Sequence, residues 1–191
     1  MIQIGQKPSP TFQEPLELLS DCHRRIPMFL QALILVMEQA QGGALNAQQR
    51  EGLETALRYF REAAPKHTAD EEESLFPRMR ELDPSTTFDA LEKIHKLKAD
   101  HDAAGQGHQL VEQLGQKWLK ENSLRTDEVS LLSETLATLQ NIYSSHISVE
   151  DNDIFPLAAK VLNERHLAEI GHEMAARRGQ NALPAWKNFS R

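Results

Sequence analysis

Apolar side chains recur every three or four positions through most of the chain, which is the pattern of amphipathic helices sharing one core. The pattern predicts four long helices and a shorter fifth. Glycine pairs, prolines and an asparagine mark their ends. The predicted helices span residues 15–41, 47–82, 87–120, 126 to beyond 150, and 163–178.

Several prolines fall within the predicted helices. Pro65 and Pro77 interrupt the second, and Pro156 is expected to kink or end the fourth. Pro27 conflicts with the first helix because it cannot donate a hydrogen bond to His23, so we expect either a bend or a misplaced helix boundary there. No alternating strand pattern competes. The predicted fold class is therefore all-α, an antiparallel up-down four-helix bundle with a short extra C-terminal helix.

The length of 191 residues suits one domain. We expect an N-terminal arm over 1–14, the bundle over 15–162, and a C-terminal helix with an irregular tail over 163–191. The formal net charge of −7 disfavours binding to nucleic acid, because such a surface repels phosphates.

The sequence also favours a cytoplasmic location. Residues 1–10 lack the features of a signal peptide. The most apolar stretch, residues 29–37, is far shorter than the ~20 residues that cross a bilayer, so no membrane association is expected. The single cysteine, Cys22, cannot form an intrachain disulfide, which fits a reducing compartment. We expect Cys22 to act as a small buried apolar residue, with redox sensing as the alternative.

On each of the four long predicted helices, the row of apolar residues that recurs every three or four positions also contains a histidine. Two of these four rows contain a glutamate as well. Burial of unpaired carboxylates is costly, and metal ions would compensate for it. Residues four apart lie on one helix face, so each His-x-x-x-Glu pair can reach a shared point in the core. Mixed imidazole and carboxylate ligation suits iron, and also manganese or zinc. The predicted ligands are His23, His67, Glu71, His101, His146 and Glu150.

An internal repeat strengthens this prediction. The segment HTADEEESLFP, which begins at His67, matches HISVEDNDIFP, which begins at His146. The preceding single histidines repeat too, since His23 comes 44 residues before His67 and His101 comes 45 before His146. The chain thus reads as two copies of one helical hairpin. Two such half-sites facing each other predict two metal ions.

The pattern His … His-x-x-x-Glu … His … His-x-x-x-Glu resembles the hemerythrin-like family of cation-binding domains, over roughly residues 15–158. The resemblance implies an antiparallel four-helix bundle that holds two iron ions with a bridging oxo or hydroxo group. It also implies that Glu71 and Glu150 bridge the metals. His23 and His67 would bind one iron, and His101 and His146 the other.

The chain departs from the oxygen-carrying hemerythrins at two points. Leu97 stands where they have another histidine, and Glu150 comes four residues after His146 where they have an aspartate at five. The resulting symmetric set of four histidines and two glutamates is closer to the family's proteins for repair of iron centres, which respond to nitric oxide and oxidative stress.

These features suggest a non-haem di-iron protein that binds or senses oxygen, nitric oxide or peroxide. One alternative is a di-iron enzyme of stress defence that reduces peroxide or nitric oxide, or repairs iron centres. Another is a structural or storage metal site. Binding or sensing is favoured over catalysis. The expected partners are a small diatomic ligand and, if electrons are exchanged, a redox protein; the chain is expected to be a monomer or a homodimer.

Other polar and aromatic residues receive less specific interpretations. A solvated face is predicted for Asp70, Glu72, Glu73, Asp151 and Asp153, with a bond from one of them to a ligand imidazole as the alternative. His108 is expected to be a hydrogen-bonded interior histidine, the alternative being a pocket role, and Tyr143 to pack in the core rather than bond a ligand. Surface or structural positions are expected for His95, His166 and His172. No role is assigned to Trp118 and Trp186.

Overall fold

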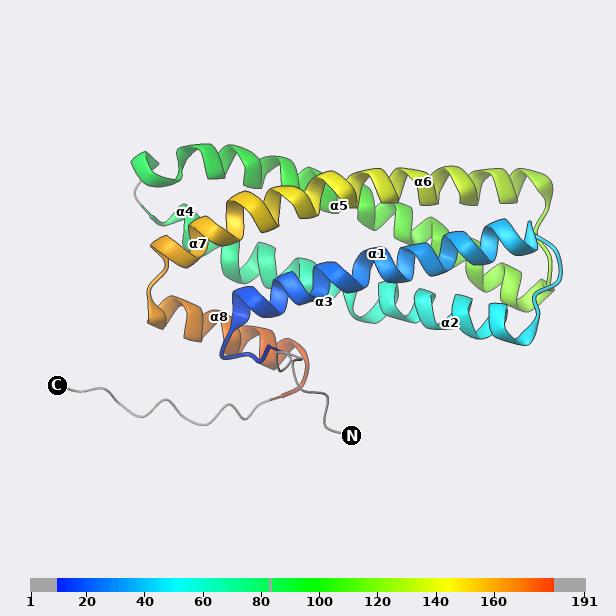
Figure 1. Cartoon of the computed structure of the whole chain (residues 1–191), viewed down its shortest axis with the longest axis horizontal. Helices are drawn as coiled ribbons and strands as arrows, with labels where there is room; N and C mark the ends of the chain where they lie inside the picture. Colours follow the sequence, from blue (N-terminus) through cyan, green and yellow to red (C-terminus); the bar gives the residue numbers. More distant parts are fainter. Residues whose placement is uncertain (1–9, 83, 181–191) are drawn as a thin grey trace, which may run out of the picture.

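The computed structural model describes residues 10–82 and 84–180, with only the backbone described for 84–87. All regular structure in these residues is helical, and no strand occurs among them. Figure 1 shows long helices lying side by side as a bundle, with a shorter helix against one end. The predicted all-α class is therefore confirmed for this part of the chain. Residues 1–9 of the predicted arm, residues 181–191 of the predicted tail and Trp186 lie outside the described residues.

Two helices form the first hairpin of the bundle. Helix α1 spans Pro15–Ala40 and continues through Pro27, so the alternative of a helix boundary at that proline is wrong. It ends at Gln41 and Gly42, both of which have positive φ, and a Cβ at Gly42 would meet Val129 at 2.3 Å. Helix α2 spans Ala47–Glu62, and a capping box between Asn46 and Gln49 begins it.

The second predicted helix is in fact a series of segments. Helix α3 (Ala64–Ala69), the π-helical segment η1 (Asp70–Leu75) and helix α4 (Phe76–Arg80) follow α2. Helix α5 spans Pro84–Glu121. The other half repeats this pattern, with α6 (Thr126–Val149), the π-helical segment η2 (Glu150–Ile154) and α7 (Phe155–Val161). Helix α8 (Glu164–Arg177) comes last, and Asn163 caps it as predicted.

The long helices form a closed ring of neighbours. Helix α1 contacts α2 and α6, and α5 contacts the same two helices from the other side. The loop after α1 is fixed to α5, because the buried Trp118 side chain donates a hydrogen bond to the Gly43 carbonyl at 2.8 Å. Helix α8 packs on α1 and η1. No described helix is long and apolar enough to cross a membrane.

The interior contains two apolar clusters separated by polar residues. Along α1, Leu19 belongs to one cluster and Ile26 to the other, and His23 lies between them in sequence. The same order holds along α5, where Leu97 and Ala104 flank His101. The six predicted ligands thus occupy one level of the bundle, between an apolar cluster toward each end.

Candidate metal centre

The six predicted ligands come from four helical stretches, α1, α3–η1, α5 and α6–η2, and their side chains meet inside the bundle. The side chains of His23 and His67 meet one oxygen of Glu71 and one of Glu150, and those of His101 and His146 meet the remaining two oxygens. The nitrogen-to-oxygen distances run from 3.2 to 3.8 Å, and all join a histidine Nε2 to a carboxylate. The donor atoms of each half-site lie within 4.8 Å of one another. Each glutamate therefore faces both half-sites.

Glu71 is the second residue of the π-helical segment η1, and Glu150 is the first residue of η2. The Phe76 N–H bonds to the Glu71 carbonyl, five residues back, and the Phe155 N–H bonds to the Glu150 carbonyl in the same way. In each repeat a proline follows the phenylalanine. A proline ring would clash with the carbonyl four residues earlier in an α-helix, and the wider turn relieves that clash. The Phe-Pro pairs visible in the repeat are thus the sequence signal for a distortion that the periodicity analysis missed.

Burial makes this cluster suitable for cations. Glu71 and Glu150 are fully buried, and none of their four carboxylate oxygens has a hydrogen bond within the described residues. Burial alone would raise the pKa of Glu71, but His67, His101 and His23 more than offset it and hold the pKa well below its usual range. Anionic oxygens without donors, facing imidazole nitrogens, fit a metal that supplies the missing positive charge.

The buried carboxylates raise the pKa of two imidazoles of the cluster, whereas burial lowers the pKa of His67. Burial lowers the pKa of His23, but Glu150 and Glu71 outweigh burial and raise it to about 10. The pKa of His101 likewise rises to about 9, because Glu71 and Glu72 overcome the effect of burial. The cluster thus attracts protons at these nitrogens when no other cation is present, and a metal ion would take their place.

Two acidic residues orient the two histidines that lie outside the His-x-x-x-Glu pairs. The carboxylate of Asp151 lies 2.9 Å from His23 Nδ1, and that of Glu72 lies 2.9 Å from His101 Nδ1. Since a carboxylate can only accept, each Nδ1 carries a proton, and Nε2 is the nitrogen that would exchange its proton for a metal. Each half of the repeat therefore orients a histidine of the other half. For Glu72 and Asp151 the solvated-face prediction is wrong and the alternative holds.

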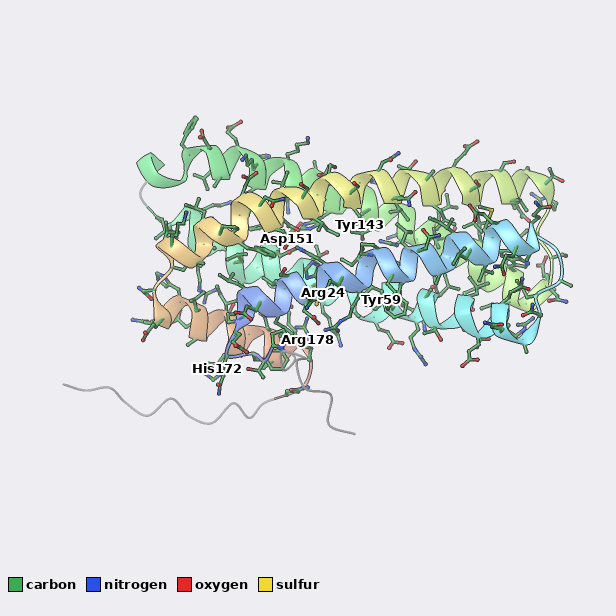
Figure 2. All side chains as sticks on the ribbon, viewed as in Figure 1. Arg24, Tyr59, Tyr143, Asp151, His172 and Arg178 are labelled. Carbon is green, nitrogen blue, oxygen red and sulfur yellow. The ribbon has the colours of Figure 1, made fainter. Side chains whose placement is uncertain are left out.

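The remaining acidic residues differ in their surroundings. Asp70 is fully buried and accepts hydrogen bonds from Arg177 at 2.9 Å and Arg178 at 2.7 Å, so the solvated-face prediction is also wrong there. Figure 2 labels Arg178 at the end of α8, close to α1. Glu73, by contrast, is exposed and pairs with Arg177, and Asp153 pairs with Lys93 across a half-exposed contact. For these two the prediction of a solvated position is confirmed.

Neutralising the two orienting carboxylates should weaken metal binding. We expect Glu72→Gln and Asp151→Asn each to lower metal affinity by roughly 10- to 100-fold, because the imidazole loses the bond that fixes its tautomer and orientation. Competition with a chelator measures this directly. Asp153→Asn is the matched control from the same π-turn and should leave affinity unchanged. Equal affinities for all three variants would contradict the orienting role.

Tyr143 and His108 form a hydrogen-bonded pair one level away from the cluster. Tyr143 is buried, and its hydroxyl lies 2.6 Å from His108 Nε2. The His108 ring stacks on Phe60 with centroids 4.3 Å apart. Figure 2 labels Tyr143 on α6. Both preferred predictions, an interior histidine with a hydrogen bond and a tyrosine packed in the core, are confirmed.

The pair predicts a pH effect on stability. Burial lowers the pKa of His108 to about 4, below its unfolded value of about 6.5. The unfolded chain therefore binds the extra proton between these values, so this contribution is complete above pH 6.5 and is lost as pH falls toward 4. We expect the wild type to lose up to roughly 3 kcal/mol more than His108→Phe over this interval. Denaturant unfolding at several pH values measures the difference, and parallel curves would contradict it.

A cavity of about 540 Å³ reaches the cluster from one side. We call it the His101 cavity. It lies between α2–α3 and α5, with His101, His108 and Tyr143 among its lining residues. His108 thus borders a cavity, and its pocket role stays a prediction. Sequence periodicity did not reveal the cavity, because a missing volume between helices leaves no regular pattern.

The other singled-out side chains lie elsewhere. His95 and His172 are exposed and His166 is half-buried, as expected for surface or structural positions. Cys22 is half-buried and borders a separate cavity. Burial raises the pKa of its thiol, which keeps it protonated and less reactive.

A comparison with known proteins supports the convergence of these residues. The family model described as the hemerythrin HHE cation binding domain matches residues 14–158, which include all six converging side chains. The chain belongs to this hemerythrin HHE family. It is also 28% identical over 178 residues to an uncharacterized protein of Haemophilus influenzae, in an alignment that covers 88% of this chain and 92% of that protein. A hemerythrin-like domain binds cations, typically iron, and the His/Glu cluster is the candidate place for them here.

Proposed function

We propose that this hemerythrin-like protein is a non-haem di-iron protein that binds or senses a small molecule such as oxygen, nitric oxide or peroxide. The main support for this proposal is that both buried glutamates face both pairs of imidazoles. This arrangement supports His23, His67, Glu71, His101, His146 and Glu150 as ligands of two ions bridged by carboxylates. It also fits the proposal of an antiparallel up-down bundle, which the path of the chain in Figure 1 supports.

The number of donors supports an exchangeable centre. Each half-site offers two imidazoles and two carboxylate oxygens. Four protein donors leave an iron ion with further positions to fill, whereas structural sites are usually closed by protein ligands. The His101 cavity gives small molecules a route toward one half-site. Iron bound here would supply redox chemistry and Lewis acidity, while the protein would hold the ligands and exclude bulk water.

The symmetric ligand set also bears on the subtype. Leu97, where oxygen-carrying hemerythrins have a further histidine, is 1% exposed and packs in an apolar cluster. It offers no donor to a metal. We therefore propose that the chain is nearer to the repair-of-iron-centres type, with two histidines for each ion.

Metal analysis and ligand titration test the proposal together. The iron-loaded protein should contain two iron ions per chain, and azide or nitric oxide should change its optical spectrum. A spectrum that neither ligand changes would refute ligand binding and leave a structural or storage site. The His101 cavity also keeps a second function open, a di-iron enzyme, and steady-state consumption of peroxide or nitric oxide would favour it over a binder or sensor.

A further inference from the structure

The His101 cavity is much larger than a diatomic ligand requires. Its volume is about 540 Å³. A water molecule occupies about 30 Å³ of liquid, and a dry cavity of about 150 Å³ is enough to bind benzene. Pockets for small organic molecules typically measure roughly 300–1,000 Å³. The size of the His101 cavity therefore falls in the range of an organic ligand site.

Its walls are mainly apolar and partly aromatic. The stacked rings of Phe60 and His108 both belong to the lining. Aromatic ligands gain from offset or edge contacts with such rings in addition to their apolar area. The apolar part of the lining also includes Leu57, Ala64, Ala104 and Val111.

The charges on the lining are compensated. Arg61 pairs with Glu112 at 2.8 Å, and both belong to the lining. His108 is neutral at pH 7, because burial lowers its pKa to about 4. Away from the candidate metal centre, an ionic ligand would thus lose hydration without finding a free opposite charge. The cavity favours an uncharged molecule.

Three lining side chains can still form hydrogen bonds. Thr68, Gln109 and Gln113 have no side-chain hydrogen bond with any residue that the structure describes. A hydroxyl donates to and accepts from such groups, and a carbonyl accepts from the amides. A few polar groups on an apolar wall are the usual means by which a pocket orients its ligand.

We propose that the His101 cavity binds an uncharged two-ring aromatic molecule that carries a hydroxyl or carbonyl group. The bound ring system lies in the same cavity as His101, next to the candidate metal centre. The inference goes beyond the proposed function, because binding depends on the cavity and does not require ligand exchange at iron. A zinc-loaded sample of the same chain tests it separately from iron chemistry.

Calorimetric titration with coumarin, an uncharged two-ring carbonyl compound, tests the proposal. The iron-loaded and zinc-loaded chains should both show saturable binding at one site. A coumarin that carries a quaternary ammonium group should bind at least about tenfold more weakly, because its positive charge has no free partner in the cavity and cannot coordinate the metal ions. Absence of saturable coumarin binding, or equal affinity for the two compounds, would overturn the proposal.

Gly105 offers a variant that blocks the cavity with little risk to the fold. It lies on α5 in the lining, and a Cβ added there meets nothing within 4 Å. Gly105→Trp should weaken coumarin binding by at least about tenfold, whereas the matched control Gly105→Ala should keep it within about twofold. Thermal unfolding checks that both variants fold. Unchanged binding by a folded Gly105→Trp chain would contradict the assigned location.

Methyl NMR on the zinc-loaded wild type locates the ligand without any mutation. Coumarin should shift the methyl signals of Leu57, Ala104 and Val111, which border the cavity. It should leave those of Leu19 and Ile170 unchanged, since both belong to the apolar cluster at the other end. The opposite pattern would place coumarin elsewhere and overturn the proposal.

Discussion

Replacing Glu71 with alanine is expected to lower the metal content of the purified chain from two ions to at most one, and Glu150→Ala should do the same. Each glutamate presents one oxygen to each half-site, so either substitution removes a donor from both. Remaining ions would be held by three protein donors instead of four. Elemental analysis after dialysis against a weak chelator measures the loss.

Glu73→Ala provides the matched control for this experiment. Glu73 belongs to the same π-turn as Glu71, but its side chain is 67% exposed and pairs with Arg177 at the surface. Its removal should leave two ions in place. Full occupancy in both Glu71→Ala and Glu150→Ala would refute the bridging assignment, even if the protein still bound metal.

Asp70→Ala should destabilise the fold by about 3 kcal/mol, which corresponds to a fall in melting temperature of roughly 6–12 °C for a chain of this size. The Asp70 carboxylate is fully buried between Arg177 and Arg178, and its loss leaves two guanidinium groups without their buried partner. We place the value at the lower end for a broken buried pair, because both arginine side chains remain about a fifth exposed. Denaturant unfolding of the metal-loaded protein measures it.

The ion pairs of Asp70 with Arg177 and Arg178 also join the end of α8 to the candidate metal centre, because Asp70 immediately precedes Glu71 in η1. Glu73→Gln again serves as the control, since its exposed pair with Arg177 should contribute less than about 1 kcal/mol. A similar loss of stability in both variants would show that the burial of Asp70 does not increase its contribution to the free energy of unfolding.

The convergence of the six candidate ligands could be predicted from the sequence because two regularities coincide at these residues. The helical period put His23, His67, His101 and His146 on interior faces, and the internal repeat related the two halves. Neither regularity contains information about the partner of an acidic residue. Asp70 and Glu72 look alike in a run of acidic residues, and only the packing of α8 against η1 and of α5 against the first hairpin gives them different roles.

The π-helical turns show a second limit of what the sequence could predict. Pro77 was expected to interrupt the second predicted helix, and Pro156 was expected to kink or end the fourth. The chain instead widens by one residue per turn and continues, because the wider turn accommodates the proline without breaking the helix. Local sequence indicated where the backbone departs from the α-helix, and the packing on both sides determined how.

The polar level across the middle of the bundle affects how the chain loses its structure. The apolar cluster toward each end is built from the same long helices, yet the two clusters are joined through histidine and glutamate side chains rather than through apolar contact. Ions bound there would couple the two ends mechanically, so that the loaded protein melts as one cooperative unit. Without them, each end is expected to fray on its own.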